Sequence, residues 1–214
     1  MIVKDWYRQV AALFVRPDSI YKQLPGVLPY DVYRDARTFP GFAPVVAHPP
    51  CRTWGRLRAF AKAPSWEHGM ALWAVEQVRQ WGGVLEHPAH STLWGAAQMP
   101  LPGEPPDRQG GYTIEVCQWW WGHRAEKKTW LYIVGLPIRE LPAIPAPPAG
   151  HPPRVIGSSK ARGARPEVTK REREATPIAF ATWLLSVARA THPQLTESAR
   201  AALARACARR EERP

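Results

Sequence analysis

Cysteine and long apolar runs are scarce in this sequence, and each scarcity excludes a class of protein. The 214 residues include 3 cysteines, Cys51, Cys117 and Cys207, an odd and sparse set that cannot build a disulfide framework. The longest apolar run, residues 178–188, falls short of the roughly 20 residues that cross a bilayer. Charges within residues 1–10 stand where an export signal needs its apolar centre. We therefore expect a cytoplasmic protein without a membrane partner.

Acidic residues are also scarce relative to basic ones. The chain has 18 Asp and Glu against 29 Lys and Arg, which gives a formal net charge of +11 and a pI of about 10.1. The excess is uneven, since residues 151–214 hold 13 Lys and Arg but 6 Asp and Glu. A basic segment beside a less charged domain favours a polyanionic partner, and nucleic acid is the commonest one.

Strand and helix patterns alternate along the first part of the chain. Apolar runs at residues 10–15 and 43–47 are typical of buried strands, and residues 66–81 carry apolar side chains near helical spacing. Short strands are predicted at residues 84–85 and 130–135. This order predicts an α/β fold in which a mainly parallel sheet is flanked by helices. Ligands of such sheets bind beyond the carboxyl ends of the strands.

Proline and charge divide the chain into three parts. Residues 1–140 are predicted to form one domain. Residues 141–175 begin as a proline-rich spacer and continue as a basic segment, which we expect to be poorly ordered without its partner. Residues 176–214 form a basic C-terminal extension, in which helices are predicted at residues 178–190 and 194–210.

The strand at residues 43–47 ends at a sequence suited to nucleophilic chemistry. Pro49 and Pro50 fix the backbone just past the strand end, so the Cys51 side chain is aimed at the crevice with little entropy left to lose. Arg52 beside it is expected to favour the thiolate, which is the nucleophilic form of cysteine. An inert core cysteine is the alternative that this motif alone leaves open.

The segment VVAHPPCRTWG resembles the motif of DNA cytosine-5 methyltransferases in which a strand ends in Pro-Pro-Cys. In that family the cysteine, here Cys51 after Pro50, is the nucleophile. The segment VLEHPAHSTLW resembles the family's Glu-Asn-Pro/Val motif, with His87 in the place of the asparagine. The family's glutamate, here Glu86, holds the target cytosine at N3. A carboxyl at a buried strand end is expected to have a raised pKa and to stay protonated near neutrality.

A third segment follows in the same order as in the family. The sequence CQWWWGHRAEKKTWLYIVG resembles the region before a late strand in phage-type members, where Cys-Gln, Gly, a basic residue and Thr precede that strand. The resemblance leaves Arg124, Lys127 and Lys128 to hold DNA phosphate or to support the base. The tryptophans at residues 119–121 are either core packing or a stacking surface for bases. The remaining expected DNA contacts are Arg52, Trp54 and Arg56.

S-adenosylmethionine is the cofactor that the resemblance implies. The family has a Phe-x-Gly-x-Gly loop after its first strand, because only glycine lets the backbone approach the cofactor closely. Here that place reads LFVRPDSIYK, without a glycine. The stretch between the first strand and Pro-Pro-Cys is short, so the resemblance implies a truncated Rossmann-like methyltransferase fold. The residues that it offers for cofactor binding are Asp18, Asp31, Asp35 and Pro49.

The resemblance implies a DNA-modifying methyltransferase of a short, phage-borne type. The target cytosine is flipped out of the duplex, Cys51 adds to C6, and Glu86 supports N3 as charge develops. C5 then takes the methyl group of S-adenosylmethionine, and elimination releases the enzyme. Such a protein is expected to act as a monomer on DNA in the cytoplasm of the host cell, in DNA modification or a restriction-modification system.

Other interpretations of the same residues stay open. A protein of this fold without its cofactor loop would serve as a DNA-binding or decoy module, and Cys51 chemistry with another donor is a further alternative. Zinc chemistry is disfavoured, because Trp54 and Val84 stand where a zinc deaminase motif needs Cys and His, so we expect no metal. The zinc-capable residues are His48, Cys51, His87, His90, Cys117 and His123.

Overall fold

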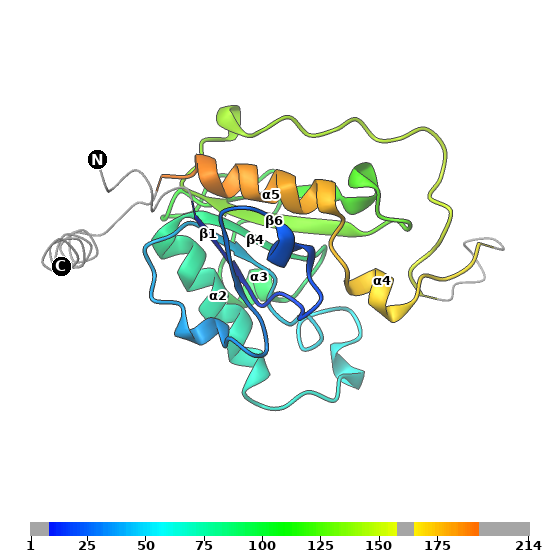
Figure 1. Cartoon of the computed structure of the whole chain (residues 1–214), viewed down its shortest axis with the longest axis horizontal. Helices are drawn as coiled ribbons and strands as arrows, with labels where there is room; N and C mark the ends of the chain where they lie inside the picture. Colours follow the sequence, from blue (N-terminus) through cyan, green and yellow to red (C-terminus); the bar gives the residue numbers. More distant parts are fainter. Residues whose placement is uncertain (1–8, 158–164, 193–214) are drawn as a thin grey trace, which may run out of the picture.

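Six strands form a single sheet that carries helices on both faces (Figure 1). The computed structural model describes residues 9–157 and 165–192. The strands are β1 (Val10–Leu13), β2 (Val27–Tyr30), β3 (Val45–Ala47), β4 (Gly83–Pro88), β5 (Tyr112–Cys117) and β6 (Lys128–Val134). The α-helices are α2 (Glu67–Trp81), α3 (Leu93–Ala96), α4 (Lys170–Glu174) and α5 (Ile178–Ala190). Short 3-10 helices are η1 (Ile20–Gln23), η2 (Ala36–Thr38), η3 (Arg58–Phe60), η4 (Gln118–Trp121) and η5 (Ile138–Glu140). The predicted α/β class is confirmed.

The sheet is mixed, so the mainly parallel pairing predicted from the sequence is not confirmed. β2, β1, β3 and β4 are parallel neighbours, whereas β6 lies between β4 and β5 and runs antiparallel to both. Residues 118–127 join β5 to β6 and are too few for the crossover of about a dozen or more residues that parallel pairing needs. Because β5 is antiparallel to β6, it runs in the same direction as β1 to β4. The carboxyl ends of β1 to β5 therefore lie at one edge of the sheet.

Both faces of the sheet are covered, which explains the uninterrupted apolar sequence of the inner strands. Along β1, Ala11 and Leu13 belong to the core under α2, whereas Val10 and Ala12 belong to the core under α5. Successive side chains of a strand point to opposite faces. A strand covered on both sides therefore needs apolar residues at every position.

Most of the long predicted elements are present. The strands predicted at residues 10–15, 43–47 and 130–135 appear as β1, β3 and β6, and the helices predicted at residues 66–81 and 178–190 appear as α2 and α5. β2 and β5 are additional strands that the sequence patterns do not predict. Within the described ranges, no helix is long and apolar enough to cross a membrane.

The segment that follows the proline-rich spacer shares its core with the sheet. α5 packs against β1, β3 and β4, and its Phe180 and Leu184 are buried with apolar side chains of these strands. α4 forms in the segment expected to be poorly ordered, and it begins with a capping box between Thr169 and Glu172. The helix predicted at residues 194–210 lies outside the described residues.

Gly83 allows a test of the contact between β3 and β4. Its φ is 128°, and an added Cβ would lie 2.0 Å from the carbonyl oxygen of Val45. We expect Gly83→Ala to lower the free energy of unfolding by about 3 kcal/mol or more, since backbone strain and overpacking each cost about 1–3 kcal/mol.

Urea unfolding measures the change. Gly69→Ala is the control, because Gly69 lies on α2 with nothing within 4 Å of an added Cβ. This variant is expected to gain about 0.5–1 kcal/mol from helix propensity. Equal stability of the two variants would contradict the close approach of β3 and β4.

Candidate active site

The strand ends bring the predicted chemical residues to one edge of the sheet. The chain leaves β1 for β2 on one side and later enters β3 on the other side. The space beyond β1 and β3 is therefore the topological switch point, where ligands of doubly wound sheets bind. The residues gathered here are His48 and Cys51 after β3, Glu86 and His87 in β4, and Gln118 after β5.

Glu86 is the centre of a buried hydrogen-bond cluster. Its Oε2 lies 3.0 Å from His48 Nδ1, and its Oε1 accepts a hydrogen bond of 2.9 Å from Gln118 Nε2. The other ring nitrogen of His48, Nε2, lies 3.0 Å from the Tyr21 hydroxyl of η1. Gln118 Nε2 also donates to Thr129 Oγ1 of β6 at 3.1 Å. Both carboxylate oxygens are thus held by side chains from other elements.

A neighbouring cation and a hydrogen bond keep Glu86 ionised. Burial raises the pKa of the Glu86 carboxyl, but the charge of Lys127 and the hydrogen bond with His48 outweigh burial and lower the pKa to about 2. The expectation that Glu86 stays protonated near neutrality is therefore wrong. The physical reason is that folding places Lys127 and His48 beside a carboxyl that burial alone would have neutralised.

Cys51 is exposed at the same edge of the sheet. Its backbone oxygen accepts hydrogen bonds from the amides of Trp54 and Gly55, which make a tight turn after the two prolines. Protein atoms around the thiol desolvate it and, together with the charge of Glu86, raise its pKa, while Lys127 acts in the opposite sense. The neutral thiol therefore predominates in the free protein near pH 7.

Arg52 attracts the Cys51 thiolate, as expected, but does not outweigh the burial of the thiol and the charge of Glu86, which raise the pKa of Cys51. Its guanidinium pairs with the buried carboxylate of Glu67 at the start of α2. The ion pair ties the segment after Cys51 to α2.

His87 lies on the opposite face of β4 from Glu86, as alternation along a strand requires. Its ring is fully buried, with its centroid 6.3 Å from that of Trp94. Burial lowers the pKa of His87 to about 4, against the opposing effects of the Glu86 charge and the Pro50 carbonyl. His87 is therefore a neutral packing residue behind the turn that contains Pro50.

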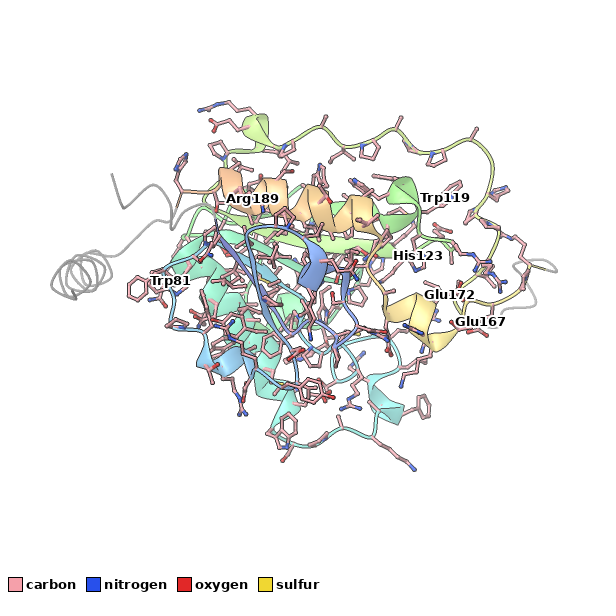
Figure 2. The ribbon with its side chains drawn as sticks, viewed as in Figure 1. Trp81, Trp119, His123, Glu167, Glu172 and Arg189 are labelled. Atoms are coloured by element: carbon pink, nitrogen blue, oxygen red, sulfur yellow. The ribbon has the colours of Figure 1, made fainter. Side chains whose placement is uncertain are left out.

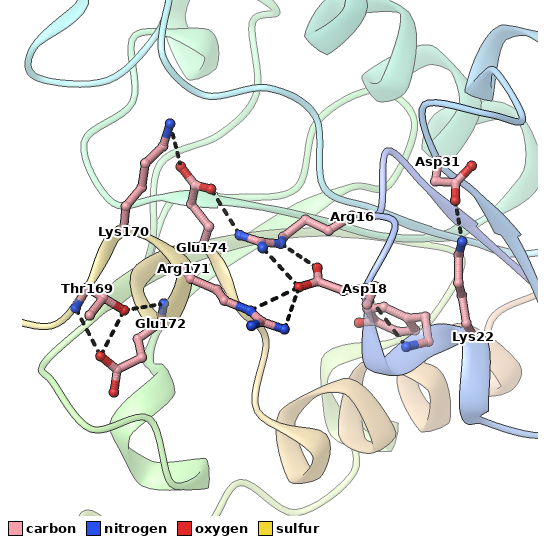
Figure 3. A network of polar contacts seen from close by, with 11 residues as sticks. Arg16, Asp18, Lys22, Asp31, Thr169, Lys170, Arg171, Glu172 and Glu174 are labelled. Carbon is pink, nitrogen blue, oxygen red and sulfur yellow. Dashed lines mark hydrogen bonds and ion pairs between the residues drawn. The ribbon is translucent and has the colours of Figure 1, made fainter.

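Ion pairs close the turn after β1, where the resemblance places the cofactor loop (Figure 3). Asp18 lies 2.9 Å from Arg16 Nε and 3.0 Å from Arg171 Nη2 of α4. Arg16 also pairs with Glu174 of α4 at 3.0 Å. The turn contains no glycine, and Phe14 itself adopts the left-handed region at φ 60°. α4 is therefore fastened to the turn that would have to approach the cofactor.

The other predicted cofactor residues are engaged as well. Asp31 directly follows β2, pairs with Lys22 and accepts hydrogen bonds from two backbone amides of the next turn. Asp35 caps η2 and pairs with Arg37 at 2.6 Å. Pro49 is buried. In this arrangement the residues do not form a cradle for S-adenosylmethionine, because each carboxylate already has a cation and a local structural role.

The residues predicted to contact DNA differ in exposure. Trp54 is 3% exposed and stacks on His68 with ring centroids 3.7 Å apart, so it is a packing residue. Arg56 and Lys128 are exposed, and Lys127 is half-buried beside the Glu86 cluster.

His123 and Arg124 both contact Glu172 of α4. His123 and Glu172 are labelled in Figure 2. Arg124 pairs with Glu172 at 2.5 Å, and His123 Nε2 lies 3.2 Å from the Glu172 backbone oxygen. His123 Nδ1 lies 2.8 Å from the Ala125 oxygen. Among the residues that the structure describes, no three His, Cys, Asp or Glu side chains are grouped to hold a metal ion. The zinc alternative gains no support from this geometry.

The three consecutive tryptophans have different surroundings. Trp121 is buried, with its ring centroid 5.2 Å from that of Trp183 in α5. Trp119 and Trp120 are half-buried and line a cavity of about 420 Å³ that Lys128 also borders. Core packing accounts for the third tryptophan, whereas the first two border open space beside β5.

The Glu86 cluster contains residues that the sequence reasoning did not assign to it. Gln118 and Thr129 occupy the Cys-Gln and Thr positions of the third resembling segment, and that resemblance is the signal that marks them. The sequence marks His48 only as a zinc-capable side chain. Tyr21 carries no sequence signal, because the parallel pairing of β1 with β3 is what brings η1 next to His48.

Comparison with protein-family models, with curated proteins and with solved structures finds no match to this chain. The function is therefore inferred from the geometry of the site and from the resemblance of its motifs.

Glu86→Gln tests the electrostatic link between Glu86 and Cys51. Loss of the negative charge is expected to lower the pKa of the Cys51 thiol. Alkylation by iodoacetamide near pH 7.5 should then become about threefold to tenfold faster, the change for up to one pKa unit.

Mass spectrometry of the Cys51 peptide follows this cysteine apart from Cys117 and Cys207. Glu76→Gln is the control, since Glu76 is exposed on α2, and it is expected to alkylate at the wild-type rate. A Glu86→Gln rate no faster than that of the control would contradict the link.

Proposed function

We propose that this protein modifies cytosine in DNA through a covalent bond between Cys51 and C6 of the base. The observation that carries the proposal is an exposed thiol beside a buried, doubly hydrogen-bonded carboxylate at adjoining strand ends. A cysteine at a switch-point crevice is positioned as a nucleophile. A carboxylate that is held on both oxygens has the fixed position that recognition of one base edge needs. The resemblance of both motifs supports cytosine as the base.

The proposed step begins with a cytosine flipped out of its duplex. The Cys51 thiol loses its proton to solvent, its sulfur forms a bond to C6, and the electrons of the C5–C6 double bond shift through C4 to N3. N3 takes up a proton from water on the side held by Glu86, and C5 becomes nucleophilic. The charge of Lys127 favours the thiolate in this step. The product is a covalent intermediate whose C5 reacts with an electrophile.

S-adenosylmethionine is the methyl donor that the resemblance implies, within a truncated Rossmann-like methyltransferase fold. The order β2-β1-β3-β4 supports a doubly wound sheet, and Asp31 follows β2, where such sheets place the acid that binds a ribose. The closed, glycine-free turn after β1 does not fit the cofactor in this arrangement. The residues present support the covalent adduct more directly than the transfer itself.

DNA is the partner that we propose, with the protein acting as a monomer in the cytoplasm of a phage host, in DNA modification or a restriction-modification system. The exposed Arg56 and Lys128 lie on segments next to the site and support contact with phosphate. The net charge of +11 supports the same partner.

A second candidate function is a DNA-binding or decoy protein that has lost cofactor binding. The ion pairs of Arg16 and Asp18 with α4 favour it, because they close the turn where the cofactor would lie. A third possibility is that Cys51 forms the covalent adduct but a donor other than S-adenosylmethionine supplies the transferred group. Covalent chemistry at Cys51 is the observable that separates the decoy from both enzymes.

Tritium release from DNA labelled at C5 of every cytosine tests the covalent step without a donor. In the adduct, C5 takes a proton from water, and the elimination that follows removes tritium, so addition is recorded whatever the target sequence. We expect the wild-type protein to release tritium and Cys51→Ala to release none above background. Cys207→Ala, the same change elsewhere in the chain, is expected to keep the wild-type rate.

The same reactions with S-adenosylmethionine identify the donor. Mass spectrometry of the digested nucleosides should then show 5-methylcytosine with the wild-type protein and none with Cys51→Ala. DNA binding without tritium release would overturn the enzymatic function in favour of the decoy. Tritium release without a methylated nucleoside would point to another donor.

A further inference from the structure

The cavity bordered by Trp119 and Trp120 has no part in the covalent step. It lies between the end of β5, the start of β6 and the end of the proline-rich spacer at His151 and Pro152. Trp119, labelled in Figure 2, belongs to η4. The volume of about 420 Å³ is within the range of about 300–1,000 Å³ that is usual for small-molecule sites. The cavity is therefore large enough for a single nucleotide.

A series of packed aromatic rings fixes one wall of this cavity. The ring of Trp120 stacks on that of Trp121, with centroids 6.0 Å apart and an angle of 27° between the planes. Trp121 packs in turn against Phe180 and Trp183 of α5, at centroid distances of 4.9 and 5.2 Å. Trp120 is thus anchored to the core under α5. An aromatic wall that is already in place loses little entropy when a planar ligand stacks on it.

The polar groups around the cavity limit the kind of planar ligand. Glu115 is engaged, because its Oε2 accepts a hydrogen bond of 2.9 Å from Trp130 Nε1 and its Oε1 lies 3.8 Å from Lys128 Nζ. Glu126 is exposed, and a carboxylate accepts hydrogen bonds from the amino group of a base. The Lys128 ammonium attracts phosphate and repels a cationic ligand. A nucleotide suits this lining better than a cation does.

The cavity is adjacent to the Glu86 cluster. Trp119 lines the cavity, and the residue before it, Gln118, donates a hydrogen bond to Glu86. Lys128 of β6 also lines it, and the next residue, Thr129, accepts a hydrogen bond from Gln118. A DNA strand that brings a cytosine to Glu86 therefore passes next to the cavity.

We propose that this cavity is a subsite for one unpaired base of the strand that carries the target cytosine. The base stacks on Trp119 and Trp120, its phosphate lies toward Lys128, and its amino group lies toward Glu126. A base inside a duplex is stacked on both faces and paired, so the subsite selects DNA that is single-stranded or opened beside the target. This inference names the substrate class of the proposed function. It rests on DNA as the partner and does not require the covalent step.

A double-mutant cycle between Trp119 and the bases of a single strand tests the subsite. The ligands are a short adenine oligonucleotide and the same sugar–phosphate chain without bases, each with a fluorophore at one end. Neither contains cytosine, so Cys51 has no ring to attack. Fluorescence anisotropy at one fixed salt concentration measures both affinities. We expect the wild-type protein to bind the adenine oligonucleotide about fivefold or more tightly than the base-free chain, the effect of one stacked base.

The variants remove a tryptophan inside or outside the cavity. Trp119→Ala is expected to lose most of the preference for bases and to keep its affinity for the base-free chain, because Lys128 remains in place. Trp119→Leu, which keeps an apolar side chain, has the same expectation and serves if Trp119→Ala does not fold. Trp66→Ala is the matched control, since Trp66 is 59% exposed before α2 and does not line the cavity. It should keep the wild-type preference.

Each outcome has one meaning. A wild-type preference for bases that Trp119→Ala loses and Trp66→Ala keeps supports the inference. A preference that is absent from the wild-type protein, kept by Trp119→Ala or lost by both variants overturns it. Competition by tetramethylammonium chloride beyond that of equal sodium chloride would overturn it in favour of a cation site. Absence of binding to either oligonucleotide also overturns it, and the tritium assay on duplex DNA then decides the proposed function separately.

Discussion

A buried negative charge near the end of β4 is the constraint on which the rest of the site depends. An ionised carboxylate taken out of water costs several kcal/mol unless it is paired and hydrogen-bonded. Glu86 meets this requirement with His48 from the end of β3, Gln118 from η4 and the charge of Lys127. The cluster forms when these segments are in register together. A slip of β4 by one residue would exchange the faces of Glu86 and His87. The neutral ring of His87 would then lie beside Lys127 in place of the carboxylate.

The mixed topology is what supplies the later partners. β6 runs antiparallel between β4 and β5, so it begins at the edge where β4 and β5 end. Lys127 and Thr129 therefore reach the Glu86 cluster from the start of β6. The backbone N–H of Gln118 donates a hydrogen bond of 3.0 Å to the Lys127 carbonyl oxygen. A parallel last strand would begin at the opposite edge and bring neither residue. The departure from a mainly parallel sheet is thus part of the construction of the site.

The sequence is sufficient for the parts of the structure that depend on local periodicity. β1, β3, α2 and α5 follow from apolar runs and helical spacing, and the strand ends locate Cys51 and Glu86. The ionisation of Glu86 does not follow, because it depends on His48 and Lys127, which are distant in the chain and meet through the sheet. Pro29 interrupts the strand pattern of β2, so this strand is not predicted from the sequence. Asp31, which directly follows β2, interacts with neighbouring residues of its own turn and of η1. The resemblance suggests which carboxylates would bind a cofactor. It does not reveal that each of these carboxylates already pairs with a basic side chain of this chain.

The two halves of the candidate site differ in how firmly they are held. The Glu86 cluster is buried, and leaving one of its polar groups without a partner costs about 1–3 kcal/mol or more. The ion pairs that join α4 to the turn after β1 are partly exposed, with side chains of Arg16 and Glu174 at 32% and 45% exposure. Such pairs contribute about 0–1 kcal/mol each and weaken as salt rises. The ion pairs that close the turn therefore oppose cofactor binding less strongly than their number suggests. The geometry around Glu86 persists when salt weakens these pairs. Salt and polyanions act first on the half of the site near β1, and the covalent chemistry proposed for Cys51 depends on the half that they leave unchanged.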